Sequence, residues 1–499
     1  MFLTILIAFS AFILIYYLLG VYNEIYWKRR GVKFYKKNRV FGPMWEFLTT
    51  DRAFFIILND IYKKYPNEPA VGLGTIITPG LYIKDPVNIE HILQMDFKAF
   101  NHKGIEIHED DKLADNMLFM SGNRWKVVRQ NMTPIFTSAK LKNMFYIMDR
   151  SARDFVDLLN NNPDKLKHDA FKIMCTFSCA ALGAAVFGIG TSSIFQSPFL
   201  KMAFKALQPT KSRNIKFMIT SLNTKLYKCL GLKIFKEHEE FFIPAIKQLI
   251  LQREQENVRR HDFGDICIDL KRKGLLKDHD SGLQLEPTDE LLAAQAFFYY
   301  VAGVEPVGVA MFSALLELGR NPEILRRVHD EIDRSFENNN NKMSYDTIMQ
   351  MEYLDMVYNE SLRMYPPIGF FVRECVRNSV LPVGNIKVDK GTKIFAPIYE
   401  IHHDPKYFPD PEVFNPERFS RENRSSIPHY TFLPFGNGNR ICLGIRYAGL
   451  QLKTGLVHLL RNFTVKTIVR EGGIKFNKQN VQVRPGNLEI EFTPRSITM

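Results

Sequence analysis

The residues best suited to chemistry lie in one glycine-rich loop, FLPFGNGNRICLG, which spans residues 432–444. Its fixed positions are Phe435, Gly438, Arg440, Cys442 and Gly444. Glycines let a backbone approach a flat cofactor and direct N–H groups at the sulfur, and a cation two residues before Cys442 suits an anionic propionate. The sequence becomes helical after Gly444, and the N-terminus of a helix favours a thiolate over a thiol. The loop therefore predicts a thiolate that holds a haem iron; the alternative is a buried structural cysteine.

A group of charged residues precedes this loop in the chain. The segment EYLDMVYNESLRMYPP indicates a helix that ends at Pro366, and it places Glu360 and Arg363 on one helical face. A proline-rich run, DPEVFNPERF, follows and contributes Arg418. One carboxylate between two guanidiniums is satisfied without titrating near neutral pH, so we expect these three residues to be structural.

Further upstream, the segment NRWKVVRQNMTPIF places Trp125 and Arg129 four residues apart, and hence on one face of a helix. An indole N–H and a guanidinium fork both suit propionate oxygens. A solvated surface arginine is the alternative interpretation for each such cation.

These motifs, in this order and over nearly the whole chain, resemble the cytochrome P450 superfamily, most closely its insect microsomal members that metabolise xenobiotics. The resemblance implies haem b (iron protoporphyrin IX) as the cofactor and Cys442 as the ligand of its iron. It further implies that the haem is bound by Trp125, Arg129, Arg373, Phe435 and Arg440. It also implies that Glu360, Arg363 and Arg418 form a buried ion network that braces the haem-side core.

The fold class is expected to be mainly α with minor β sheets, as in a cytochrome P450 fold preceded by one N-terminal transmembrane helix. No linker, internal repeat or long charge block divides the 499 residues after residue 40, which favours one large domain. Helices are expected near 87–96, 137–161, 166–187, 235–257 and 288–318, with another that begins at Asn321 and Pro322. Strands are expected in 70–86, after Pro366 and in the C-terminal segment LEIEFTP.

The first 23 residues carry no charged side chain and supply about the 20 apolar residues that a bilayer crossing needs. A cleaved signal peptide, the alternative, needs a basic start and a small-residue cleavage site. We expect a transmembrane signal anchor over 1–23, a basic juxtamembrane linker over 24–45 and a haem-thiolate catalytic domain over 46–499. Trp27 is expected at the membrane interface, and the basic residues 28–30 are expected to hold the body in the cytosol. The expected location is the endoplasmic reticulum membrane.

Composition narrows the classes of partner. The net charge of +13 suits an anionic membrane surface or an acidic protein, and because basic residues are dispersed without a nucleic-acid motif we expect no nucleic acid. The six cysteines are scattered and indicate free thiols in a reducing compartment. His402 and His403 are adjacent and lack a second ligand pair at a usable spacing, so we interpret both as structural.

The central helix, expected from Thr288 as its N-cap to Gly319 at its end, departs from the resembled family. Residues 302–307 read AGVEPV, and Pro306 stands where the family carries a threonine whose hydroxyl helps to deliver the proton for O–O cleavage. Proline inside a regular helix costs on the order of 3 kcal/mol, which predicts a kink or a widened groove. Glu305 is the candidate catalytic residue, a proton donor that acts through a water; a surface salt bridge is the alternative.

The resemblance, together with the departure at Pro306, leads to three functional hypotheses. The first is a monooxygenase that receives electrons from NADPH through a flavoprotein reductase, with cytochrome b5 as a further candidate partner and a small lipophilic molecule as substrate. Loss of the threonine motivates the second, an isomerase or dehydratase of oxidised lipids, and the third is a haem protein without turnover. Arg446 and Lys126 are candidates for docking the reductase. By their positions in the resembled family, the candidate pocket residues are Phe297, Phe298, Ala302 and 368–372; the alternative is that each belongs to the ordinary core.

Overall fold

In the computed structural model the described residues are 1–108, 110–167, 169–188, 198–207, 210–222, 224–256, 259–278, 280–479 and 481–496. The helices are α1 (Phe2–Lys28), α2 (Pro43–Thr49), α3 (Phe54–Lys64), α4 (Pro86–Glu90), α5 (Gly122–Met132), α6 (Ser138–Asn160), α7 (Ala170–Phe187), α9 (Pro198–Leu207), α10 (Lys211–Leu222), α11 (Thr224–Cys229), α12 (Lys236–Glu256), α13 (Phe263–Lys273), α14 (Asp289–Arg320), α15 (Pro322–Glu337), α16 (Tyr345–Met349), α17 (Glu352–Met364), α18 (Tyr399–His402) and α19 (Ile445–Asn462). The expected mainly helical architecture is confirmed.

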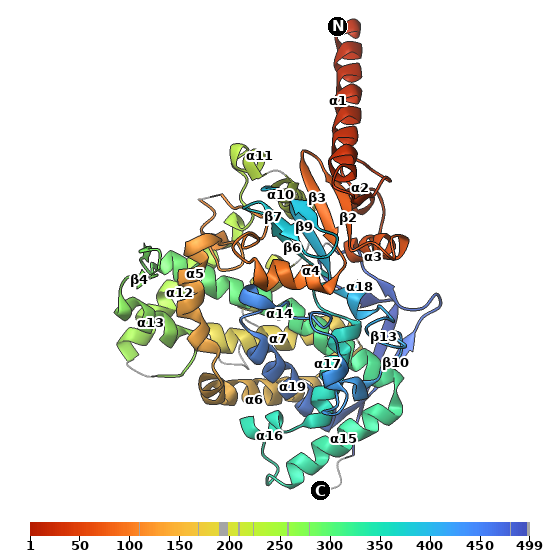
Figure 1. Ribbon diagram of the computed structural model, residues 1–499. Coiled ribbons are helices and arrows are strands. Elements are labelled where there is room, and N and C mark those ends of the chain that lie inside the picture. Colours follow the sequence, from red (N-terminus) through yellow and green to blue (C-terminus); the bar gives the residue numbers. More distant parts are fainter. Residues whose placement is uncertain are drawn as a thin grey trace.

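The largest sheet has the strand order β1-β2-β3-β9-β6 and lies beside the base of α1 (Figure 1). Its strands are β1 (Lys33–Phe34), β2 (Ala70–Thr75), β3 (Thr78–Ile83), β6 (Phe370–Glu374) and β9 (Lys393–Pro397). The pairs β1–β2 and β3–β9 are parallel, whereas β2–β3 and β6–β9 are antiparallel. The two-stranded sheets pair β4 (Leu276–Lys277) with β5 (Gln284–Leu285), β7 (Ser379–Leu381) with β8 (Ile386–Val388), β10 (Phe463–Val469) with β13 (Leu488–Pro494), and β11 (Lys475–Phe476) with β12 (Pro485–Gly486). The expected strands in 70–86, after Pro366 and in LEIEFTP are therefore present.

Helix α1 projects away from the body (Figure 1) and has a mean hydropathy of 2.5 over its most apolar 18 residues, none of them buried. It is a candidate membrane span by length and composition. Helices α7 and α14 are also long and apolar, but 89% and 72% of their most apolar stretches are buried inside the protein. Burial explains their apolar character, so α1 is the exposed span among the described helices.

Trp27, expected at the membrane interface, is instead completely buried where α1 joins the body. Its indole lies against Gly72 of β2, where an added Cβ would come within 2.4 Å of the ring. Asn23 donates hydrogen bonds to the backbone oxygens of Arg39 and Ile76. The last turns of α1 are therefore anchored in the core, and Trp27 serves packing rather than lipid contact.

Helix α14 runs through the middle of the helical region and contacts α7, α12, α17, α19 and β10 (Figure 1). Thr288 caps its first turn as expected, accepting a hydrogen bond from the Leu291 N–H. The helix continues to Arg320, so the expected end at Gly319 is wrong by one residue. Gly319 is needed for packing instead, because a Cβ there would lie 2.4 Å from the Thr467 hydroxyl of β10. The helix also continues without a break through Pro306.

The other expected helices are present with shifted ends, and residues 168 and 257 of the expected ranges lie outside the described part of the chain. The expected helix at 87–96 is α4 followed by a π-helical turn, His91–Met95. The helix expected from residue 166 begins at Ala170. In α15, Pro322 occupies the first turn, and the buried stripe consists of Leu325, Val328, Ile332 and Phe336.

Candidate functional site

The cysteine loop depends on two glycines in a left-handed conformation. Gly436 has φ 67° and Gly438 has φ 69°, a region that side chains rarely adopt. A Cβ at Gly438 would also lie 2.2 Å from the backbone oxygen of Leu93. The chain then makes one 3-10 turn, Gly438–Arg440, and the Cys442 N–H donates to the Phe435 oxygen at 3.0 Å. Cys442 stands two residues before Gly444, the N-cap of α19, as expected.

The environment of the Cys442 sulfur combines burial with positive charge. Burial raises the pKa of the thiol, whereas the Gly444 N–H and the charges of Arg129 and Lys103 lower it. Cys442 is an exposed residue, so space beside it is open to a ligand. A metal ion in that space would reverse the effect of burial, because coordination deprotonates a thiol.

The three predicted arginines converge beside the cysteine, and each binds a backbone oxygen. Arg129 donates to Ile441 at 2.9 Å, Arg440 donates to Met120 at 2.7 Å, and Arg373 donates to the oxygen of its neighbour in β6 at 2.8 Å. The Arg440 guanidinium also lies 4.3 Å from the centroid of the buried Trp125 ring. The structure therefore brings α5, β6 and the cysteine loop to one place.

Lys103 is a fourth cation of this cluster, and sequence analysis missed it. Burial lowers its pKa well below the ordinary value, and the charges of Arg373, Arg440 and Arg129 lower it further. The residue lies in the segment before α5, where a single lysine between Asn101 and Gly104 carries no pattern. Only the three-dimensional convergence of distant segments identifies it.

The cluster of Lys103, Arg129, Arg373 and Arg440 has an uncompensated charge. No carboxylate in the described part of the chain forms an ion pair with any of the four. Burial lowers the pKa of Arg373 to about 10, and burial with the neighbouring cations lowers that of Arg440 to about 9. The Nε of Arg373 and the Nε and Nη1 of Arg440 are buried without a hydrogen-bond partner. Buried N–H donors and unpaired cations are costly, so the cluster fits a ligand that carries two negative charges.

Haem b satisfies these requirements, because it carries two propionates on a flat ring whose iron accepts a thiolate. Four cations and three free N–H groups suit the propionates, and the exposed residue Cys442 lies beside them. Phe435 is half-buried in the loop and contributes the backbone oxygen that holds the Cys442 amide. The residues present therefore fit the predicted cofactor.

The buried ion network is also formed. Arg363 makes a two-pronged contact with Glu360 through two bonds of 2.8 Å, and both side chains are completely buried. Arg418 lies 3.3 Å from the same carboxylate, which also accepts the Asn415 N–H at 2.9 Å. The network joins α17 to the 3-10 turn Pro416–Phe419, as the sequence predicts.

Between its two ends, α14 has exposed surface only in its middle. Residues 291–297 and 307–318 are buried, whereas Phe298, Ala302, Glu305 and Pro306 are half-exposed on one side of the helix. Ile368, Phe371 and Val372 are half-exposed likewise. Of the predicted pocket residues, Phe298, Ala302, Ile368, Phe371 and Val372 are therefore half-exposed, whereas Gly369 and Phe370 are buried. Phe297, also predicted for the pocket, is 1% exposed, and its ring centroid lies 4.9 Å from that of Phe242 in the core.

Glu305 contacts the C-terminal loop between β11 and β12. The Gln482 side-chain amide donates to Glu305 Oε2 at 3.4 Å. Burial raises the pKa of Glu305, while the charges of Arg484 and Arg213 oppose that shift. The exposed salt bridge considered for Glu305 is not formed with the described residues.

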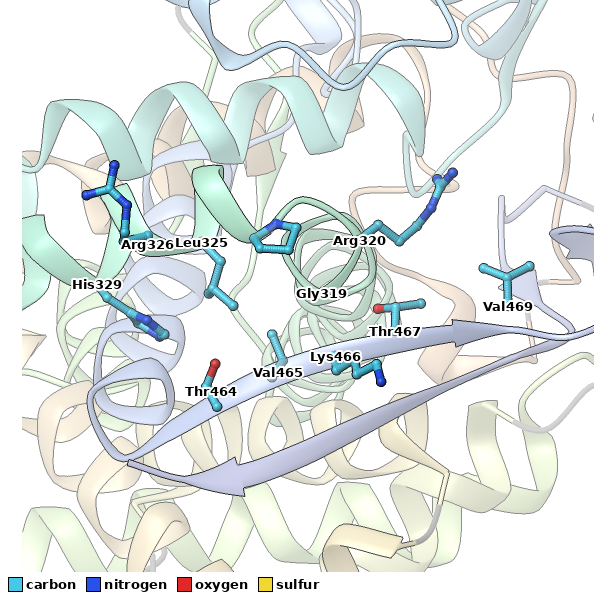
Figure 2. Close-up of a pocket in the computed structure, with 11 residues that line it drawn as sticks. Gly319, Arg320, Leu325, Arg326, His329, Thr464, Val465, Lys466, Thr467 and Val469 are labelled. Atoms are coloured by element: carbon cyan, nitrogen blue, oxygen red, sulfur yellow. The ribbon is translucent and has the colours of Figure 1, made fainter. Parts of the chain in front are cut away.

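A separate groove of about 800 Å³ lies between the end of α14, the start of α15 and β10 (Figure 2). Its walls include Gly319, Leu325 and His329 on one side and Thr464 and Thr467 on the other. None of the predicted site residues lines it. The groove is therefore distinct from the site around Cys442.

A family model described as "Cytochrome P450" matches residues 35–492 of the chain. The chain is 30% identical to cytochrome P450 6B7 of Helicoverpa armigera, over 98% of both chains. It is 32% identical to cytochrome P450 6k1 of Blattella germanica, over 92% of this chain and 91% of the other. A third relative, probable cytochrome P450 6d4 of Drosophila melanogaster, is 30% identical over 97% of both chains.

Proposed function

Because the chain belongs to the cytochrome P450 family and is therefore a haem-dependent monooxygenase, we propose that it inserts one atom of O2 into a lipophilic substrate. Electrons come from NADPH through a membrane-bound flavoprotein reductase. The observation that carries the proposal is the cluster of Lys103, Arg129, Arg373 and Arg440 beside the exposed residue Cys442. When bound, haem b supplies the activation of dioxygen.

The chain's own residues have three roles around that cofactor. Cys442 holds the iron as a thiolate, supported by the Gly444 N–H and the helix N-terminus behind it. The cations and the Trp125 indole bind the propionates and so orient the ring. The Glu360 network keeps α17 and the segment before the cysteine loop in fixed relation.

Glu305 is the proton donor that we assign to the distal side. Pro306 offers neither a hydroxyl nor an N–H, so the nearest acidic group on the exposed face of α14 is the Glu305 carboxyl. Its raised pKa retains a proton closer to neutral pH, which suits an acid catalyst. Gln482 donates to Oε2 and thereby leaves the proton on Oε1.

The reductase docks on the cysteine face of the protein in this proposal. Arg446, in the first turn of α19, is exposed and is the stronger docking candidate. Lys126 is engaged already, because Asp278 and Asp280 both form ion pairs with it. Cytochrome b5 would compete for the same surface. Helix α1 anchors the protein in the endoplasmic reticulum membrane, with the body on the cytosolic side.

Reconstitution of the full chain with reductase in vesicles tests the function. Product formation coupled to NADPH consumption across a panel of lipophilic compounds supports the proposal. Product from a lipid hydroperoxide without NADPH would instead support an isomerase or dehydratase, the second candidate that Pro306 motivates.

Two variants test the proton donor. Glu305→Gln should lower the ratio of product to NADPH consumed by roughly 10²-fold or more, the usual contribution of a general acid. Pro306→Thr should raise that ratio if a hydroxyl is limiting. An unchanged ratio in Glu305→Gln would remove Glu305 from the mechanism.

A further inference from the structure

His402 lies between the ion network and the cysteine loop and forms hydrogen bonds with both. The residue is completely buried at the end of α18. Its Nδ1 lies 3.1 Å from the Arg363 backbone oxygen, and its Nε2 lies 2.8 Å from the Leu433 amide nitrogen. Its own backbone oxygen accepts a bond of 2.8 Å from the Arg363 guanidinium. His402 thus forms two hydrogen bonds with Arg363 and one with Leu433 at the beginning of the loop.

These bonds determine the protonation state of the ring. A backbone N–H can only donate, so Nε2 accepts from Leu433 and Nδ1 carries the proton that is donated to Arg363. Burial lowers the pKa of His402 well below its ordinary value, and the neighbouring His403 and Arg363 lower it further. The ring is therefore neutral and uses both of its nitrogens.

Packing fixes the plane of the ring. The His402 ring stacks on Phe432, with ring centroids 5.4 Å apart and planes inclined by 29°. Phe432 in turn packs against Phe419 at 4.8 Å, and Phe419 ends the 3-10 turn that carries Arg418. Leu433 is itself completely buried and follows Phe432 directly. The loop entrance is therefore held by one directional bond and one stacked contact, both made by His402.

The adjacent His403 provides a contrast within the same chain. It stacks on Tyr399, and its Nδ1 is 2.8 Å from the oxygen of that same residue, four positions earlier in α18. Within the described part of the chain, its side chain makes no hydrogen bond to another element. The two neighbouring histidines thus differ in whether the ring joins α18 to the cysteine loop, and His403 is half-buried whereas His402 is completely buried.

We propose that His402 is the positioning residue that fixes the cysteine loop to the Glu360–Arg363 network and so keeps the Cys442 thiolate in register. The bond to Leu433 lies nine residues before Cys442, and the Cys442 N–H is held within the same loop by Phe435. Loss of the His402 ring would leave the Leu433 N–H and the Arg363 oxygen buried without partners. The inference rests on the haem-thiolate part of the proposed function and not on turnover.

Three variants of the haem-loaded full chain test this role. His402→Phe keeps the stacked ring but removes both hydrogen bonds, His403→Phe is the matched control, and His402→Gln restores one donor and one acceptor. The readout is the carbon-monoxide spectrum of the reduced haem, which separates thiolate from non-thiolate ligation, followed over time at fixed temperature. Hydrogen exchange of the Leu433 amide is a second readout that is independent of the haem spectrum.

His402→Phe should lose the thiolate-type spectrum roughly tenfold faster than the parent, the factor expected for a buried donor left unpaired, and should expose the Leu433 amide to exchange. His403→Phe should match the parent, and His402→Gln should recover most of the difference. Equal rates in His402→Phe and the parent, or equal losses in both phenylalanine variants, would overturn the proposal. If His402→Phe takes up no haem while the other two variants do, the proposal is supported; if none of the three does, it is overturned. A parent with a stable thiolate spectrum but no NADPH-dependent product would refute the monooxygenase and leave this test intact.

Discussion

Glu400 is a buried carboxyl without a hydrogen-bond partner, and its removal should stabilise the protein. The residue lies in α18 with 1% of its surface exposed, and both carboxyl oxygens are buried and unpaired. The backbone N–H of Glu400 itself and the Tyr82 hydroxyl of β3 favour the charged form, but neither meets hydrogen-bond geometry. Burial raises the pKa of Glu400 from 4.5 to about 8. Replacement by glutamine keeps the shape of the side chain and removes its charge.

The sign of the effect follows from proton linkage. Below pH 4.5 the carboxyl is protonated in both the folded and the unfolded chain, so pH has no differential effect there. Between pH 4.5 and about 8 the folded protein binds the proton that the unfolded chain has released, and stability falls as pH rises. At about 1.4 kcal/mol for each pH unit, the loss is on the order of 5 kcal/mol, and it is complete above about pH 8.

The measurement is the unfolding temperature of the haem-loaded Glu400→Gln variant and of the parent at a series of pH values. An unfolding entropy of about 2.1 cal/mol/K per residue over ~450 residues is close to ~1 kcal/mol/K, so the variant should melt roughly 5 °C above the parent in alkaline buffer. The difference should shrink steadily toward about pH 5. Glu412→Gln, an exposed site nearby, controls for the loss of a carboxylate. A difference between Glu400→Gln and the parent that is constant over this pH range would refute the linkage argument.

Three shorter predictions concern the haem side. Gly438→Ala should destabilise the holoprotein by several kcal/mol because its Cβ would meet the Leu93 oxygen at 2.2 Å. Gly436 is equally left-handed but lies in open space, so Gly436→Ala should cost only about 1–2 kcal/mol. The midpoints of urea unfolding compare the two variants. Glu360→Gln should cost about 3–5 kcal/mol because two guanidiniums are left without a carboxylate, and full stability of the haem-loaded variant would argue against the network. The Lys103→Leu variant should lose haem to a scavenging protein roughly 10–100-fold faster than the parent, which is the effect of one lost charge-assisted hydrogen bond. A transfer rate equal to that of the parent would remove Lys103 from the propionate site.

The sequence predicts the cysteine side of the site well because its determinants are local. Gly438, Arg440 and Cys442 lie within five positions, and the conformation of such a loop depends mainly on its own glycines. Glu360 and Arg363 are likewise placed by helix periodicity, and their bidentate pairing is observed. Residues whose roles follow from short-range geometry can be read from the chain.

Long-range convergence is not visible in the sequence. Lys103 and Gln482 lie in irregular segments without periodicity, and each acquires its role from elements that are distant in the chain. The prediction for Trp27 is wrong for a different reason. An aromatic residue after an apolar span is typical of a membrane interface, but tertiary packing against Gly72 places Trp27 in the core. The helices α9, α10 and α11 were not among the expected elements either.

The cation cluster links cofactor binding to the stability of the fold. Lys103, Arg129, Arg373 and Arg440 come from three separate parts of the chain, and burial together with mutual repulsion opposes their approach. A dianionic ligand offsets the repulsion between the cations, so each propionate stabilises the arrangement of cations that binds it. The ion network and His402 differ from the cations because their hydrogen bonds and ion pairs are made within the protein itself. Bonds within the protein therefore position the cysteine loop, whereas the cations are assembled without carboxylate partners among the described residues and would gain them from the propionates.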